Sequence, residues 1–172
     1  MQKATPFQFP DLDQLPGGLR AEVLNRRSLN VYRMIMHSPQ VAPAFLAMSD
    51  ALRQENSLPG TWRELAILRV GHSYAADYEV HHHERLARSV DLADAAIAAT
   101  CHGADQSTLT PQERQILALT DELLEQHALS ASSRRGALEF LSANQLADLL
   151  FTVGFYQLVC NFLNTFGVPV ES

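Results

Sequence analysis

Hydrophobic side chains recur along most of this chain at intervals of three and four residues, the spacing that places them on one face of an α-helix. No stretch shows the sustained alternation of apolar and polar residues, bounded by turn residues, that is typical of a β-strand. The pattern therefore predicts an all-α fold, a compact single-domain helical bundle of seven to eight helices with short links. The expected helices span residues 29–38, 40–56, 62–73, 76–90, 92–103, 111–128, 133–142 and 146–170.

Two of these helices begin with a local signal. The sequence Thr-Trp-Arg-Glu at residues 61–64 fits a capping box, in which Thr61 caps the helix and Glu64 returns to the Thr61 amide. Thr110 precedes Pro111, which suits the first helical position because the N–H that proline lacks would be unpaired there. Helix starts are therefore expected at about Trp62 and at Pro111.

The two ends of the chain differ in character. Residues 1–28 are punctuated by proline and glycine and are expected to form an N-terminal arm, with the helical domain spanning residues 29–172. Residues 146–170 are apolar over nearly the length that crosses a bilayer. They are interrupted by four polar side chains, so we expect a helix buried in a core or between subunits and no membrane contact; these are Asp148, Gln157, Asn161 and Asn164.

Composition narrows the class of protein. The 172 residues fit one domain, 47% are hydrophobic and 19% are charged, which is typical of a soluble protein. The net charge is −6 and the 13 Lys and Arg residues are scattered, which argues against a nucleic-acid partner and favours a small-molecule substrate or a protein partner.

Cys101 and Cys160 lack the spacing of metal ligands or of a redox pair and are expected to be reduced, buried thiols. No signal peptide is apparent, and a cytoplasmic location is expected.

The segment DYEVHHHER at residues 77–85 is the densest group of ionisable side chains. Successive residues of a helix point about 100° apart, so the three histidines cannot face one point. On a helical wheel Glu79 and His83 fall on the apolar, inward face, His81 falls on the opposite side, and His82 lies at the edge. We therefore expect His81 to be exposed and His83 to be buried beside Glu79.

Glu79 and His83 are four residues apart, the spacing at which side chains meet on one helical face. A buried carboxylate and imidazole shift each other's pKa, which suits general acid–base chemistry. The same pair could instead be a hydrogen-bonded structural contact, and the sequence leaves both interpretations open. Glu64 also has two interpretations. It completes the capping box, but on the helical wheel it falls between the apolar residues Ile67 and Leu68, which would point it inward, toward the next helix.

A metal site is the remaining interpretation of this segment. Glu79 and His82 have the Glu-x-x-His spacing of di-iron helical bundles. Such sites need a second copy of the motif and two further inward glutamates, and no second copy is present. We therefore expect no bound metal.

Three stretches together resemble a known family. They are RELAILRVGHSYAADYEVHHHERLARSVDLADAAIAA at residues 63–99, TPQERQILALTDELL at 110–124 and GFYQLVCNFLNTFGVPVE at 154–171. The chain resembles the carboxymuconolactone decarboxylase family, which includes the alkylhydroperoxidase D-like proteins. The resemblance runs from about residue 30 to the end and is most specific between Glu64 and His83. It implies a helical bundle of the alkylhydroperoxidase D-like type.

The family's peroxidase branch has a glutamate, a Cys-x-x-Cys pair and a histidine in this order. The glutamate falls on Glu64 and the histidine on His83, but the cysteine positions fall on Ala76 and Glu79. Without a thiolate at these positions there is no nucleophile for a peroxide. An alkylhydroperoxidase-like antioxidant activity is therefore the disfavoured alternative.

The chain is more similar to the cysteine-free branch, whose Tyr-Glu-x-x-x-His pattern is present at residues 78–83. The resemblance implies a cofactor-free lyase or isomerase acting on a small lactone or keto acid. In it His83 would be the general acid or base, Glu64 and Glu79 would position it, and Tyr78 and His82 would line the substrate pocket.

A carboxylated lactone calls for a cationic partner, and the sequence offers Arg69 or Arg85. The resemblance also implies a homo-oligomer, a trimer or hexamer, which agrees with the apolar surface of the last helix. A non-catalytic oligomeric binding protein, in which the acid–imidazole group is structural, is the second alternative.

Overall fold

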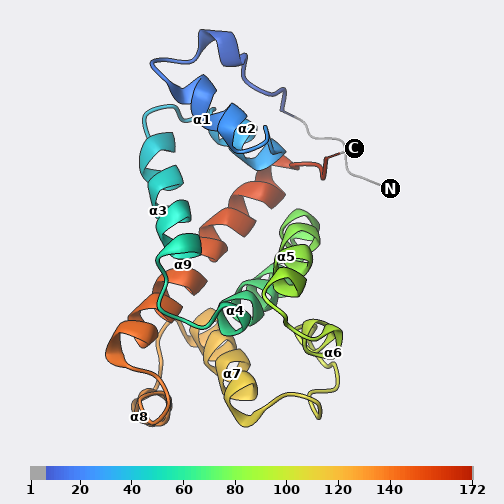
Figure 1. Cartoon of the computed structure of the whole chain (residues 1–172), viewed down its shortest axis with the longest axis vertical. Coiled ribbons are helices and arrows are strands. Elements are labelled where there is room, and N and C mark those ends of the chain that lie inside the picture. Colours follow the sequence, from blue (N-terminus) through green and yellow to red (C-terminus); the bar gives the residue numbers. More distant parts are fainter. Residues whose placement is uncertain (1–6, 172) are drawn as a thin grey trace. The chain divides into compact units, whose positions relative to one another are not determined.

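The computed structural model describes residues 7–171, and within them the chain is all-α, with nine α-helices, one 3₁₀-helix and no strand (Figure 1). This confirms the predicted fold class. By their contacts the residues fall into two compact units, one made of the residues up to Glu55 with those from Phe162 onward, the other of Asn56–Asn161. The boundary expected between residues 28 and 29 stays a prediction.

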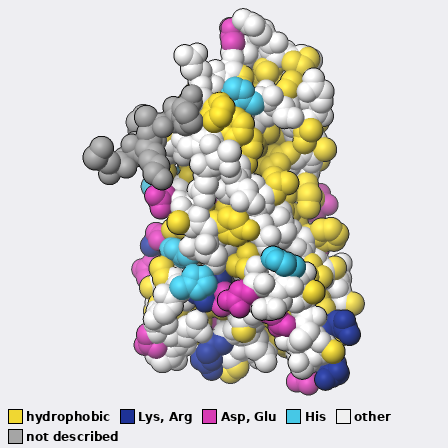
Figure 2. All heavy atoms as spheres, turned by 180° about the vertical axis from the view of Figure 1, so that it is seen from behind, with side chains coloured by type: hydrophobic (Ala, Val, Ile, Leu, Met, Phe, Trp, Pro, Cys, Tyr) yellow, Lys and Arg dark blue, Asp and Glu magenta, His cyan; other side chains and the backbone are white. Residues whose placement is uncertain are grey.

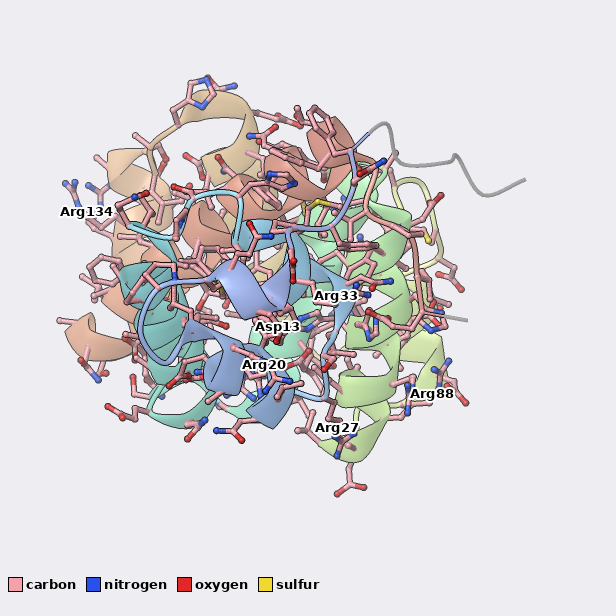
Figure 3. All side chains as sticks on the ribbon, turned by 90° about the horizontal axis from the view of Figure 1, so that it is seen from above. Asp13, Arg20, Arg27, Arg33, Arg88 and Arg134 are labelled. Carbon is pink, nitrogen blue, oxygen red and sulfur yellow. The ribbon has the colours of Figure 1, made fainter. Side chains whose placement is uncertain are left out.

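The first unit contains the 3₁₀-helix Leu12–Gln14 and the helices α1 (Leu19–Asn25), α2 (Asn30–Ile35) and α3 (Ala42–Gln54). Residues 1–6 of the expected arm lie outside the described residues, but its remainder is partly helical, which the sequence did not lead us to expect. Arg20 of α1 pairs with Asp13 at 2.8 Å (Figure 3). The core of this unit is built from apolar side chains of all three helices and their links: Leu19, Val23, Tyr32, Ile35, Met36, Ala42 and Leu46.

The second unit contains α4 (Gly60–Ser73), α5 (Asp77–Ser89), α6 (Asp94–Ala98), α7 (Pro111–Gln126), α8 (Ala131–Ala137) and most of α9 (Ala143–Phe166). Helix α4 packs against both α5 and α7 (Figure 1). Every residue of α4 from Glu64 to Gly71 is buried. A helix that is buried around its whole circumference is a core helix, so a polar residue within it must find a partner inside the protein.

The junction of α4 and α5 is tight for two reasons. A Cβ atom added at Gly71 would lie 3.0 Å from Cγ2 of Val80, so glycine permits the close approach of α5. Ala75 then turns the chain with a φ of 48°. The Ala76 amide donates to the Gly71 carbonyl and the Ala75 amide to that of His72, the two hydrogen bonds of a Schellman motif.

The two predicted helix starts had different outcomes. At Thr110 the side chain accepts from the Glu113 amide, Glu113 accepts from the Thr110 amide, and α7 begins at Pro111 as expected. At Thr61 the capping box is not formed: α4 begins at Gly60, its cap residue Pro59 has no side-chain hydrogen bond, and Glu64 is buried. The Glu64 carboxylate has a different partner, described below.

Helix α9 is the one described helix that is long and apolar enough to cross a bilayer, by length and composition. Half of its most apolar stretch is buried within the protein, which is also the property of a core helix. Two of its polar residues bind the link before α4, since Asp148 accepts from the Ser57 amide at 2.7 Å and Thr152 accepts from the Asn56 side chain at 3.0 Å, whereas Asn161 and Asn164 are exposed. These contacts favour the expected role as a buried helix.

Candidate active site

Three ionisable side chains from α4 and α5 meet in the interior of the second unit. His83 Nδ1 lies 2.7 Å from Oε2 of Glu64, and His83 Nε2 lies 2.9 Å from Oε1 of Glu79. The three side chains are only 8%, 3% and 6% exposed in the order His83, Glu64, Glu79. Glu79 and His83 thus face inward, as the helical wheel predicted, and Glu64 joins them from the neighbouring helix.

The protonation of His83 follows from its surroundings. Burial by itself lowers the pKa of an imidazole, but the charge of Glu79 and the hydrogen bonds of Glu64 and Glu79 outweigh burial and raise the pKa of His83 to about 9. At neutral pH the ring is therefore an imidazolium, and each of its N–H groups donates to a carboxylate. The ring of Tyr156 from α9 meets His83 edge-on at 5.0 Å between centroids.

Arg63 is a further member of this cluster that the sequence analysis missed. Its Nε lies 3.4 Å from Oε1 of Glu64, and its side chain is 14% exposed. Glu64 therefore stands between two cations, with one oxygen toward Arg63 and the other toward His83. The signal in the sequence was the position of Arg63 next to Glu64, in the first turn of a buried helix.

The other residues of the histidine segment have separate positions. Tyr78 is buried and its ring lies 4.4 Å from that of His82, which is half-buried. His81 is exposed, as expected. The role of Tyr78 and His82 in substrate binding stays a prediction.

A cavity of about 290 Å³ lies on the outer side of the α4–α5 junction. Its polar walls come from His72, Asp77, His81 and Glu84. Glu64, Glu79 and His83 do not line it, so it is separate from the buried cluster. Figure 2 shows histidine side chains close to Asp and Glu side chains on one face of the molecule.

The two arginines proposed for substrate binding are not part of the cluster. Arg69 is buried, and its Nε and Nη2 bind the two oxygens of Asp121 at 2.6 and 2.7 Å. Its Nη1 donates to the Thr100 carbonyl at 3.0 Å. Arg69 therefore ties α4 to α7 and has no free edge for an anion. Arg85 is exposed.

The two cysteines differ from the expectation that both are buried. Cys160 is buried, and burial together with the charge of Glu79 raises the pKa of its thiol far above the ordinary value, so it is unreactive. Cys101 is only half-buried, and its Sγ lies 3.4 Å from Nε2 of His72. Burial lowers the pKa of His72. Within residues 7–171, no hydrogen bond joins either cysteine to His83.

The described residues contain no group of three or more His, Cys, Asp or Glu side chains arranged to hold a metal ion. In the Glu64–His83–Glu79 cluster the carboxylate oxygens point at ring nitrogens that both donate. These nitrogens have no lone pair for a metal while the ring is an imidazolium.

Comparisons with known proteins extend this picture. Residues 39–122 match the model of the Carboxymuconolactone decarboxylase family. One similar solved structure is an uncharacterized peroxidase-related protein from Ralstonia eutropha JMP134, described as an alkylhydroperoxidase AhpD core. The two structures superpose with a TM-score of 0.87 at 19% sequence identity, and the alignment covers 100% of this chain and 95% of the Ralstonia chain. An uncharacterized peroxidase-related protein from Silicibacter sp. TM1040 superposes with a TM-score of 0.85 at 15% sequence identity. The alignment covers 99% of this chain and 93% of the Silicibacter chain. No curated protein matches.

A third structure, a protein of unknown function from Agrobacterium tumefaciens, has a TM-score of 0.72 at 17% identity, with 80% of this chain and 95% of that chain covered. At these identities the likeness shows the fold. The family match includes all of α4 and α5 and therefore the whole buried cluster. The chain thus has the alkylhydroperoxidase D-like fold, and its residues 39–122 are similar to the carboxymuconolactone decarboxylase family.

Proposed function

We propose that this protein transfers protons on a small lactone or keto acid, as a cofactor-free lyase or isomerase. It would belong to the branch of the family that lacks the cysteine pair, since Ala76 and Glu79 stand at those two positions. The observation that supports this best is the buried chain Glu64–His83–Glu79, in which one imidazolium is enclosed by two carboxylates. Clustered, strongly perturbed titratable groups are typical of active sites.

The pKa of about 9 suits His83 to donate a proton at neutral pH. Glu64 fixes the Nδ1 side of the ring, so Nε2 is the atom that exchanges partners. When substrate binds, its carbonyl oxygen displaces the Glu79 carboxylate from Nε2 and accepts the hydrogen bond that Nε2–H donated to Glu79. The ring then stabilises negative charge that develops on this oxygen.

The released Glu79 carboxylate completes the reaction as the base. It takes a proton from the carbon next to the carbonyl, and the electron pair of the C–H bond moves to the oxygen as an enolate held by Nε2–H. Return of the proton to a different carbon gives an isomer. In a lyase the bond between the α-carbon and a carboxylate breaks instead, carbon dioxide leaves, and Glu79 stays ionised. The carbon of the enolate then takes the Nε2 proton of His83, which the ring regains from water.

Three features of the wider protein belong to the same proposal. Tyr78 and His82 contact the bound substrate, and the chain acts in the cytoplasm on a small molecule. It works as a homo-oligomer, a trimer or hexamer. Leu150, Phe151 and Leu158 support self-association, because they are 43%, 58% and 54% exposed on α9 and apolar surface of this kind favours a protein partner.

Two alternatives each rest on one observation. The structural neighbours named peroxidase-related favour hydroperoxide turnover, for which Cys101 beside His72 is the accessible thiol. The double hydrogen bonding of His83 favours a structural cluster in a non-catalytic binding protein, because both ring nitrogens are occupied.

Deuterium exchange from heavy water separates these three functions. Lactones and keto acids are incubated with the protein, and NMR detects deuterium at the carbon next to the carbonyl. We expect incorporation that falls by about 10²-fold or more in His83→Gln and not in His81→Gln, a matched change at the exposed neighbour. Equal rates in the two variants would exclude His83 from the chemistry, and hydroperoxide turnover lost in Cys101→Ser would favour the peroxidase.

A further inference from the structure

Cys101 and His72 form a second pair of reactive side chains, separate from the buried cluster. Cys101 follows α6, and its Sγ lies 3.4 Å from Nε2 of His72, near the end of α4. Cys101 is half-buried, whereas Cys160 is buried and has a strongly raised thiol pKa. A thiol in contact with an imidazole has the arrangement of an activated nucleophile, in which the ring takes the thiol proton.

His72 is suited to take that proton. Burial is the largest influence on its ring and lowers its pKa, so the ring is neutral at pH 7 and one of its nitrogens accepts a proton. The charges of Arg69 and His102 lower the pKa further, while that of Glu84 raises it. The neutral ring of His72 is therefore a base at neutral pH, in contrast to the imidazolium of His83.

The cavity on the outer side of the α4–α5 junction, here called the outer cavity, provides a binding space next to this pair. Its volume is about 290 Å³, close to the lower end of the range for small-molecule sites. His72 forms part of its wall, and α5 supplies Asp77, His81 and Glu84. Cys101 contacts the same imidazole, so the thiol is one side chain away from the outer cavity. A bound molecule that extends past the ring of His72 reaches Sγ.

The charge of the outer cavity favours one class of ligand. Its wall includes the carboxylates of Asp77 and Glu84, and no Lys or Arg of residues 7–171 lines it. Arg88 lies 3.5 Å from Glu84, but it is 50% exposed and its Nε is bound to Asp94 at 2.8 Å (Figure 3). An exposed ion pair of this kind is weak, so the two carboxylates attract cations into the outer cavity and repel anions.

We propose that Cys101 and His72 form a thiol modification site that reacts with small, positively charged disulfides bound in the outer cavity. The inference does not depend on the proposed function of the His83 cluster. His72 takes the Cys101 proton, and the thiolate sulfur attacks one sulfur of the disulfide. A new S–S bond to Cys101 forms as the old one breaks, and the released thiolate takes the proton from His72. One disulfide is exchanged for another, so no further oxidant or reductant is needed.

Three disulfides of different charge test the selectivity of this site. They are cystamine, which is positively charged, bis(2-hydroxyethyl) disulfide, which is neutral, and dithiodiglycolate, which is negatively charged. Mass spectrometry of the folded protein at pH 7 follows the adduct at Cys101, and each rate is divided by the rate of N-acetylcysteine amide with the same reagent. After this correction we expect cystamine to react about tenfold faster than dithiodiglycolate, because Asp77 and Glu84 attract only the cation.

Variants separate the charge of the cavity from the reactivity of the thiol. Asp77→Asn combined with Glu84→Gln should reduce the preference for cystamine to about twofold, whereas Glu125→Gln, at an exposed acid of α7, should leave it unchanged. His72→Gln should slow all three reagents about tenfold, because residue 72 can then no longer take the thiol proton. Cys101→Ser should abolish the adduct.

Three results would overturn the inference. They are equal corrected rates for the three disulfides, a preference for cystamine that survives in the Asp77→Asn, Glu84→Gln variant, and wild-type rates in His72→Gln. An adduct at Cys160 in folded Cys101→Ser would also overturn it, because the reactive thiol would then lie elsewhere. None of these rates depends on deuterium exchange, so the result is independent of the test of the proposed function.

Discussion

Glu64 and His83 are 19 residues apart and lie on different helices, yet Oε2 of Glu64 is 2.7 Å from Nδ1 of His83 in a buried position. This contact makes α4 and α5 two halves of one polar cluster. It also explains why Glu64 does not cap its own helix. A carboxylate used at the helix start is exposed and weakly held, whereas here it stabilises a buried positive charge.

The cluster makes stability depend on pH. The pKa of His83 is raised from 6.5 to about 9 on folding, so below pH 6.5 both states hold the proton and the stabilisation is complete. As the pH rises from 6.5 to about 9 the unfolded chain has already released its proton, and the contribution, about 3 kcal/mol, is lost.

Urea unfolding at pH 6 and at pH 9.5 measures this effect. We expect the free energy of unfolding to fall between the two pH values in the wild type and much less in His83→Gln, in which residue 83 cannot titrate. Identical pH dependence in the two proteins would show that His83 does not carry the raised pKa.

Arg69 is expected to be a structural residue. Arg69→Met leaves the Asp121 carboxylate and the Thr100 carbonyl without their donors, and we expect a loss of about 3 kcal/mol in the free energy of unfolding. Arg88→Met, which removes an exposed guanidinium paired with Asp94, should change stability little. Chemical denaturation of both variants gives the comparison, and equal stabilities would contradict the role assigned to Arg69.

Thiol reactivity tests the peroxidase alternative. Cys101 is half-buried, while Cys160 is buried with a strongly raised thiol pKa, so a thiol reagent should modify one cysteine in the folded protein and two after unfolding. Deuterium exchange should be retained in the double variant Cys101→Ser, Cys160→Ala. Exchange lost in a stably folded double variant would mean that a thiol takes part.

The apolar residues of α9 predict self-association. Phe151→Asp combined with Leu158→Asp should convert the oligomer to a smaller species in analytical ultracentrifugation, because charge cannot be buried at an apolar interface. Leu24→Asp, at an isolated exposed leucine of α1, is the control. A wild type that sediments as a monomer at micromolar concentration would remove this part of the proposal.

Local signals were sufficient for part of the fold. The period of the apolar residues gave the helical class, Thr110 and Pro111 gave the start of α7, and the spacing of Glu79 and His83 gave their shared face. These features depend on residues within a few positions of one another. Helix α1 was missed because its surroundings are rich in glycine and proline.

The spacing of apolar residues could not predict which side chains of different helices contact each other. The position of Glu64 against His83 depends on how closely α5 approaches α4 at Gly71. The helical wheel indicated only that Glu64 could face inward, and the family resemblance paired it with His83. The sequence also did not show that Arg63 contacts Glu64 while Arg69 binds Asp121 through two nitrogens. Arg69 has a structural role because it binds Asp121, which lies 52 residues away in the sequence.

The account depends on His83 being an imidazolium between two carboxylates at neutral pH, and ¹⁵N NMR of labelled histidine measures this directly. We predict that Nδ1 and Nε2 of His83 both carry a proton at pH 7 and that the ring titrates with a pKa of about 9. The resonance is assigned by its loss in His83→Gln. A neutral His83 ring at pH 7, titrating at or below the ordinary value of 6.5, would contradict the account.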